Sequence, residues 1–230
     1  DGGKLCLNHK VVGLSKNNDT WQIKVNTSKK LPLNLKAKHV VFTLPPQSLL
    51  ALIPKTTCVL PRNYRNRLEN LPQPSGAIVF FGAITRRHLP KYCEGHSQLL
   101  VKEIGSIFVS ISFEGDGRAP LGQATVTASI FTDVNSWSSY SISEYRHHKD
   151  LIMEKILTAL NLQFAVNSKQ WLHKELATPR SFARWTGRPL GIVGGLGQKP
   201  TTFGPFGLPS RTPIKGLWLC GDSIYPGEGT

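Results

Sequence analysis

The stretch that decides the fold closes this sequence: Gly216-Leu-Trp-Leu-Cys-Gly221-Asp222-Ser-Ile-Tyr-Pro-Gly227-Glu-Gly229-Thr230. A short apolar run that stops at Gly-Asp predicts a strand over 217–220, followed by a Pro/Gly turn. Glycine at position 221 would let a ligand approach the backbone closely. The N–H groups of 227–229 would face a phosphate at the start of a helix, and Asp222 would accept a hydrogen bond from a ligand hydroxyl.

Two other interpretations of this stretch stay open. An ordinary strand–turn–helix unit, with Asp222 as a helix cap, needs no ligand. The run 221–224 also resembles the nucleophile block of GDSL-type serine hydrolases, in which Ser223 would attack the substrate. That block opens its domain, whereas here it closes the sequence.

Composition limits the class of protein. The 230 residues are 40% hydrophobic, which is enough for a core, and no apolar run reaches the length needed to span a membrane. The formal charge is +14, and lysines crowd the first forty residues. Such a surface would attract anionic lipid or nucleic acid. We expect a membrane surface, with a merely solvated basic surface as the open alternative. We expect no nucleic acid, because the sequence has neither zinc-finger spacing nor an aromatic RNA-binding signature.

Familiar catalytic and metal signatures are missing. The four cysteines lie far apart without a C-x-x-C pair, and His147 and His148 are neighbours that cannot share a helix face, so we expect no metal site. There is no G-x-S-x-G motif. The glycine-rich run 191–199 misses both nucleotide motifs, since Pro200 and Gln198 stand where glycines are required.

Local patterns predict a mixed α+β or α/β fold. The expected helices are short ones over 47–53 and 63–71 and a long one over 143–164, which Ser143 would cap. The expected strands cover 5–7, 11–14, 21–25, 38–43, 77–84, 106–113, 124–132, 171–177 and 217–220. This order suits a substrate domain that is inserted between pieces of a nucleotide-binding domain.

Taken with its context, the closing stretch resembles the C-terminal flavin motif of the phytoene desaturase and carotene isomerase family, in which a strand is followed by Gly-Asp and Pro-Gly-x-Gly. The segments 1–14 and 40–50 are similar to two other parts of these flavoproteins. The run 184–195, together with Phe203-Gly-Pro-Phe206-Gly, looks most like the carotenoid 3′,4′-desaturase branch.

The resemblance implies a two-domain FAD-binding fold of the glutathione-reductase-like, amine oxidase/phytoene desaturase type, without its N-terminal Rossmann unit. It implies that 1–54 is part of the FAD-binding domain, that 55–183 is the substrate-binding domain, and that 184–230 returns to the FAD-binding domain. Since the sequence opens on Asp1 and closes inside the motif, we expect a piece of a larger protein that should neither hold FAD well nor turn over alone.

The resemblance also implies roles for particular residues. Val11 aligns with the position whose backbone pairs with the flavin adenine, and Asp222 with the one that holds the ribityl and pyrophosphate region. Gly221 and Gly227 would let the cofactor approach. The residues expected to line an apolar polyene tunnel, or alternatively only to pack the core, are Trp185, Phe203, Phe206 and Tyr225. No residue is identified as a catalytic base.

The implied activity is FAD-dependent desaturation of a carotenoid C–C bond, with 3′,4′-desaturation of an acyclic end group expected. The alternatives are a carotene cis–trans isomerase, a flavin amine oxidase, and a noncatalytic membrane- or anion-binding module with a degenerate flavin fold. The expected location is the cytoplasmic side of a photosynthetic bacterial membrane, as a peripheral protein. The sequence leaves the oligomeric state and the final electron acceptor undetermined.

Overall fold

The computed structural model describes residues 2–28, 31–57, 59–197, 199–202 and 204–227. It is a mixed α/β structure that divides into two compact units. The first unit combines residues 1–74 with 194–230, and the second consists of residues 75–193. The second unit is thus inserted between two pieces of the first. The chain crosses from the first unit to the second between Pro74 and Ser75, and crosses back between Val193 and Gly194.

These crossings lie later in the chain than the expected domain boundaries at 54/55 and 183/184. The first crossing lies later because helix α2 (Arg62–Glu69) buries Leu68 in the core of the first unit. The second lies later because helix α5 (Pro179–Thr186) belongs to the second unit. Whether the two units are a flavin domain and a substrate domain stays a prediction.

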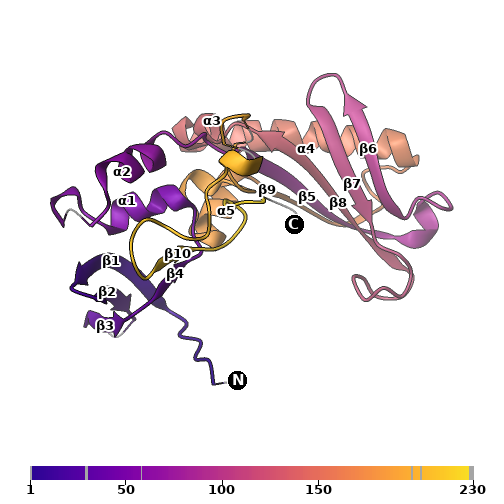
Figure 1. The fold of residues 1–230 in the computed structure, drawn as a ribbon. Helices are drawn as coiled ribbons and strands as arrows, with labels where there is room; N and C mark the ends of the chain where they lie inside the picture. Colours follow the sequence, from indigo (N-terminus) through magenta and orange to yellow (C-terminus); the bar gives the residue numbers. More distant parts are fainter. Residues whose placement is uncertain (1, 29–30, 58, 198, 203, 228–230) are drawn as a thin grey trace. The chain divides into compact units, whose positions relative to one another are not determined.

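The first unit contains two small sheets (Figure 1). One is an antiparallel sheet of β1 (His9–Asn17), β2 (Thr20–Thr27) and β3 (Leu33–Ala37). The other joins β4 (Val40–Phe42) to β10 (Leu217–Leu219) in parallel, so that segments from the two pieces of the unit lie side by side. A 3-10 turn (Pro46–Ser48) and α1 (Leu49–Leu52) follow β4, as the Pro45-Pro46 pair predicts.

The core of the first unit comes from both of its pieces. Trp21 on β2 and Leu49 on α1 are fully buried, and Leu208 and Leu217 from the second piece join the same cluster. Strand β2 alternates buried Trp21 and Val25 with outward polar residues, as the sequence predicts. The expected strand over 5–7 is wrong: Leu5 and Leu7 are exposed and precede β1, because no neighbouring strand pairs with them in the described part.

The second unit is a five-stranded antiparallel sheet with a long helix on one face. The strand order is β6-β7-β8-β5-β9. The strands are β5 (Gly76–Thr85), β6 (Gly95–Val101), β7 (Gly105–Ile111), β8 (Gln123–Thr132) and β9 (Trp171–Ala177). Helix α3 (Val134–Ser139) precedes the long helix α4 (Ile142–Phe164). The local sequence patterns did not predict strands β3 and β6 or helix α5.

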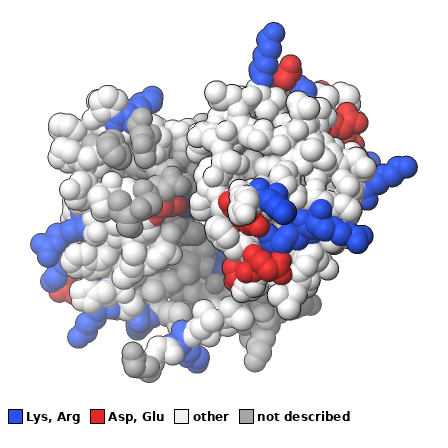
Figure 2. Space-filling model, turned by 90° about the vertical axis from the view of Figure 1, so that its right-hand side faces the viewer, with Lys and Arg blue, Asp and Glu red and all other residues white. Residues whose placement is uncertain are grey.

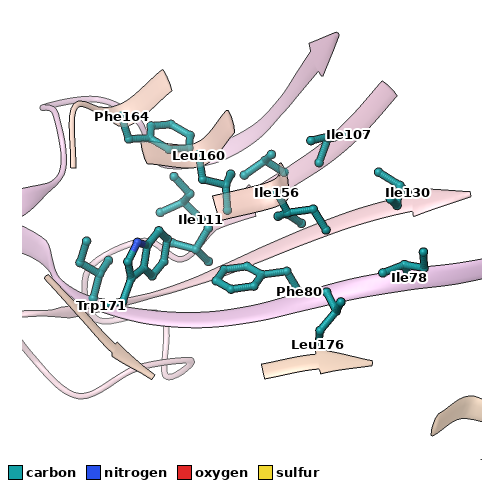
Figure 3. Packing of buried hydrophobic residues seen from close by; sticks show 14 of the residues in the cluster. Ile78, Phe80, Ile107, Ile111, Ile130, Ile156, Leu160, Phe164, Trp171 and Leu176 are labelled. Atoms are coloured by element: carbon teal, nitrogen blue, oxygen red, sulfur yellow. The ribbon is translucent and has the colours of Figure 1, made fainter. Parts of the chain in front are cut away.

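One face of this sheet packs against α4 (Figure 3). Ile156, Leu160 and Phe164 recur at helical spacing on α4 and are buried against the sheet. From the sheet side, Phe80 is fully buried, and its ring meets that of Trp171 edge to face at a centroid distance of 5.3 Å. The periodicity of α4 therefore predicted correctly which side of the helix faces the core.

The residue that caps α4 lies two positions earlier than expected. Ser141 caps it, not Ser143: the Glu144 N–H donates to Ser141 Oγ at 3.3 Å, and the Ser141 N–H donates to Glu144 Oε2 at 2.7 Å. This reciprocal capping box satisfies two backbone donors that the helix itself leaves without partners. The sequence holds Ser141 and Ser143, and only the position of glutamate three residues after Ser141 distinguishes them.

The capping box predicts a pH-dependent contribution to stability. The Ser141 hydroxyl and backbone N–H hold the pKa of Glu144 below its ordinary value of 4.5. A carboxylate with a depressed pKa in the folded state stabilises the fold above its unfolded pKa and loses that contribution as pH falls through its folded pKa. We expect Glu144→Ala to lower the melting temperature at pH 7 and to lower it less near pH 3.

Thermal unfolding followed by circular dichroism at both pH values measures this difference. The matched control is Glu154→Ala, which removes an exposed glutamate from the middle of the same helix. If the melting temperatures of both variants change in the same way with pH, the capping box is not the source of the pH dependence.

Candidate functional site

The candidate site lies where β10 ends. Strand β10 runs parallel to β4 in the register Leu217–Val40, Trp218–Val41 and Leu219–Phe42. Pairing continues for one more residue, since the Cys220 N–H donates to the Phe42 carbonyl at 2.9 Å. Gly221 then turns the chain with φ +123°, a conformation that favours glycine. Ligands of open α/β sheets bind at this carboxyl edge, so the fold puts Gly221-Asp222 in a suitable place.

Asp222 lies at the centre of a small pocket in the first unit. Two segments line the pocket, one within 195–207 and the other over 222–227. The Asp222 side chain is half-buried, and the Ser223 hydroxyl donates to its Oδ1 at 3.1 Å. A carboxylate is an acceptor of hydrogen bonds, and hydroxyl groups are among the donors that it can take.

Glycine packing brings the two segments together. A Cβ on Gly195 would lie 2.1 Å from the Asp222 carbonyl oxygen, so only glycine fits between the segments. A hydrogen bond forms a second contact between the segments: the Tyr225 N–H donates to the Leu208 carbonyl at 2.7 Å. Arg67 on α2 holds the same loop, because its Nη2 donates to the carbonyls of Phe206 at 2.9 Å and Gly207 at 3.2 Å.

The size and chemistry of the pocket limit what it can do. Its internal volume of about 20 Å³ is room for a water molecule, so a larger ligand must lie along its open side. Three of its lining residues, Gly204, Gly207 and Gly227, are glycines and add no side chain to the pocket. A carboxylate beside glycine backbone fits the polyhydroxyl chain and phosphates of a dinucleotide better than it fits an apolar group.

The structure brings some of the predicted site residues together. Asp222, Tyr225 and Gly227 line one pocket, and Gly221 directly precedes it. Val11 lies on β1 and is not among the pocket residues; its side chain is 40% exposed. The roles assigned to these residues in binding a flavin stay predictions.

Of the expected substrate-lining residues that the structure describes, only Tyr225 lines the pocket. Tyr225 is in the pocket, and Phe206 ends a short 3-10 turn (Gly204–Phe206) beside it, with both side chains more than half exposed. Phe203 lies outside the described residues. Trp185 is on α5 in the second unit, where its ring is 80% exposed and the Arg184 guanidinium lies 5.3 Å from it.

The sequence interpretation missed residues that build the pocket: Gly195, Thr202, Gly204 and Gly207. It tested the glycine-rich run against nucleotide-binding motifs, but here Gly195 serves a close backbone contact. Gly197 serves another, since its Cβ would lie 2.9 Å from the Gln73 carbonyl oxygen. The signal that could have found them was the density of glycine itself, which often marks close approach of backbone.

The cysteines do not form a reactive centre in the described part. Cys6 and Cys220 are exposed, and Cys93 is half-buried. Burial raises the pKa of the Cys93 thiol, which keeps it protonated at neutral pH and therefore weakly nucleophilic. Among the described residues, no group of three or more His, Cys, Asp or Glu side chains is placed to hold a metal ion.

Comparison with known proteins adds to this geometry. No family model matches the chain. Prolycopene isomerase 2 of an Oncidium hybrid cultivar is 33% identical over 128 residues, which cover 54% of this chain and 22% of the isomerase. Prolycopene isomerase of Daucus carota is 32% identical over 128 residues, which cover 54% of this chain and 21% of the isomerase. The matched region is thus about a fifth of the length of these curated relatives.

A solved structure supports the fold. The crystal structure of an oxidoreductase from Methanosarcina mazei matches 96% of this chain and 45% of that protein, with a TM-score of 0.58 and 18% identity. The chain therefore has the mixed α/β fold of part of an oxidoreductase, and in sequence it is similar to carotene isomerases. These relatives do not single out the 3′,4′-desaturase branch.

Proposed function

We propose that the complete protein is an FAD-dependent oxidoreductase that acts on a carotenoid. The observation that carries the proposal is the Asp222 pocket at the end of β10, where a carboxylate stands beside glycines that leave the backbone open. The similarity to prolycopene isomerases supports a carotenoid substrate, and the fold shared with an oxidoreductase supports the reaction class. The matched region is about a fifth of those relatives, so the activity belongs to the complete protein.

In this proposal the residues of the chain bind and orient the cofactor. Asp222 accepts a hydrogen bond from a ribityl hydroxyl, and Ser223 keeps the carboxylate turned toward it. Gly195 holds the two lining segments close enough for both to reach the cofactor, and Gly227 leaves room for it. FAD, when bound, supplies a hydride acceptor for the carbon substrate.

The finer proposal is desaturation of an acyclic carotenoid, with the 3′,4′ bond as the expected site. Desaturation would remove a hydride, which bound FAD would accept, and a proton, and would leave a new C=C bond in the substrate. In the first unit, Phe206 and Tyr225 are proposed to contact the apolar polyene, which offers few polar groups to hold. Trp185 of the second unit is a separate candidate for such a contact. Each of these side chains is exposed, which suits contact with a ligand at least as well as it suits core packing.

Isomerisation is a second candidate, and the relatives favour it directly. Both named relatives are prolycopene isomerases, and an isomerisation leaves the composition of its substrate unchanged. The same cofactor pocket would serve either reaction. The difference would lie in whether the polyene loses two hydrogens.

One experiment distinguishes these reactions. The complete protein is produced in cells that accumulate an acyclic carotenoid, and the pigments and bound flavin are measured by mass spectrometry and absorption. We expect a red-shifted product two hydrogens lighter than its precursor. An unchanged mass with an altered cis/trans profile would show the isomerase instead, and bound flavin without any pigment change would favour an amine oxidase.

The control variant is Asp222→Ala in the complete protein. Loss of a charged hydrogen-bond acceptor to the cofactor is expected to weaken flavin retention about tenfold. The matched variant Asp150→Ala removes an exposed carboxylate from α4 and should retain flavin. Equal flavin content in both variants would remove Asp222 from the binding site.

Location follows as a further part of the proposal. A carotenoid dissolves in membranes, and the basic surface suits a peripheral protein on the cytoplasmic side of a photosynthetic bacterial membrane. None of the helices in the described part of the chain has the length and apolar character to cross a bilayer.

A further inference from the structure

The outward face of the β1-β2-β3 sheet carries three lysines. Lys24 on β2 lies directly opposite Gly13 on β1 and Asn34 on β3. Lys10 is opposite Asn26, and Lys36 is opposite Gln22. Residues opposite each other in an antiparallel sheet share a face, as do residues two apart on one strand. Lys10, Lys24 and Lys36 therefore project from the same face.

The other face of this sheet is the one that packs in the core. It carries Trp21 and Val25, which are 0% and 3% exposed. The three lysines, in contrast, are all exposed. On the β1 side, the residue opposite Lys24 is Gly13, which has no side chain. We call Lys10, Lys24 and Lys36 the lysine face.

No carboxylate neutralises the lysine face within the described residues. The other residues on it are neutral: Gly13, Ser15, Gln22, Asn26 and Asn34. In the described part of 2–42 the acidic residue is Asp19, in the β1–β2 turn, and it pairs with Lys215 at 3.0 Å. Lys24 is the diagonal neighbour of both Lys10 and Lys36, at roughly 7–8 Å, which is within the Debye length of about 10 Å.

We propose that the lysine face docks the protein onto an anionic lipid surface. Lys24 lies within one Debye length of both Lys10 and Lys36, so their like charges repel it, and a negatively charged surface relieves that repulsion. A sheet face presents them in one plane, which matches the plane of a bilayer. Elsewhere some basic side chains pair with carboxylates, as Arg86 does with Glu94 at 2.9 Å and Arg118 with Asp116 at 2.7 Å, and Figure 2 shows basic and acidic side chains next to each other.

The choice of lipid over nucleic acid has a chemical basis. Proteins that bind single strands combine cations with aromatic side chains on which bases stack. The lysine face has no aromatic side chain, because Trp21 is buried on the opposite side of β2. The choice also rests in part on the proposed function, since a carotenoid substrate would be drawn from a membrane.

The test is cosedimentation of the full chain with vesicles, without substrate or turnover, so that its result is separate from that of the proposed reaction. Phosphatidylcholine vesicles are compared with vesicles that contain about one third phosphatidylglycerol, in low and high salt. We expect binding to the anionic vesicles in low salt, and loss of binding in high salt. The triple variant K10Q/K24Q/K36Q should bind roughly a hundredfold more weakly, since each of the three lysines near such a surface contributes about fivefold.

Three controls make the result specific. The variant K91Q/K102Q/K169Q removes the same charge from exposed lysines of the second unit and should bind like the wild type. The variant K10R/K24R/K36R keeps the charge and should also bind. Thermal unfolding checks that every variant is folded.

Other results would overturn the proposal. Unchanged binding of K10Q/K24Q/K36Q would show that the lysine face is not the docking surface. Equal weakening in both glutamine variants would assign binding to net charge alone. If the lysine face variant lost affinity for a fluorescent single-stranded oligonucleotide but not for the vesicles, the face would belong to nucleic acid.

Discussion

Replacing Gly195 by valine is expected to lower the free energy of unfolding of the first unit by about 3–5 kcal/mol, at the severe end for a single substitution. The reason is steric. A Cβ at this position would lie 2.1 Å from the Asp222 carbonyl oxygen and 2.9 Å from its carbon, so backbone has to move on one side or the other. Flexible side-chain ends can give way at such a contact, but a carbonyl that follows a strand cannot do so without disturbing its turn.

The measurement combines thermal unfolding with hydrogen exchange, because two compact units need not unfold in one transition. Faster exchange is expected around Gly195 and Asp222 than in the second unit. The complete protein should also retain less flavin, since the Asp222 turn would shift. Gly3→Val is the control, as no heavy atom lies within 4 Å of its added Cβ. Similar losses in both variants would contradict the close contact.

Replacing Phe80 by alanine is expected to lower the free energy of unfolding of the second unit by about 3–5 kcal/mol. Phe80 is 0% exposed and lies between the sheet and α4, with its ring edge to face against Trp171 (Figure 3). Its removal leaves a cavity whose walls belong to regular strands and a long helix, and these can collapse only in part. Gly82 shows how full this region is, because a Cβ there would lie 2.6 Å from both rings.

Denaturant unfolding gives this free energy, and the control is Phe131→Ala. Phe131 lies on β8 in the same sheet but is 85% exposed, so its loss should cost far less. If both variants lost the same stability, the core would not be centred where the structure puts it.

Much of the fold could be predicted from local patterns. The long helix over 143–164 differs from α4 by one residue at its start, and β9 occupies the predicted range 171–177. The helix carries a strong periodic signal, with apolar residues at helical spacing. The signal of β9 is weaker, since within this strand only Trp171 and Leu176 are buried. The missed elements have weaker signals: β6 holds glycine, serine and glutamine, and its large residue Leu100 is 88% exposed. Only pairing with β7 makes it a strand.

The residues of the candidate site also fall into two groups: those that the sequence could identify and those that it could not. Gly221, Asp222 and Gly227 could be identified because they are consecutive features of one strand and its turn, and the resemblance to flavoproteins named their role. Gly195 could not, because the need for glycine there comes from the Asp222 carbonyl, which is distant in sequence. No local pattern records such a contact.

The sequence by itself determined the Gly-Asp turn after the last strand, the apolar stripe of α4 and the alternation of β2. These features depend on neighbours within a few residues, where backbone geometry sets the spacing. Only the tertiary structure decided that β4 pairs with β10, that five strands take the order β6-β7-β8-β5-β9, and that Lys10, Lys24 and Lys36 share one face. The physical reason is that strand partners and register are chosen by long-range hydrogen bonding and shared burial, which residues far apart in the chain decide together.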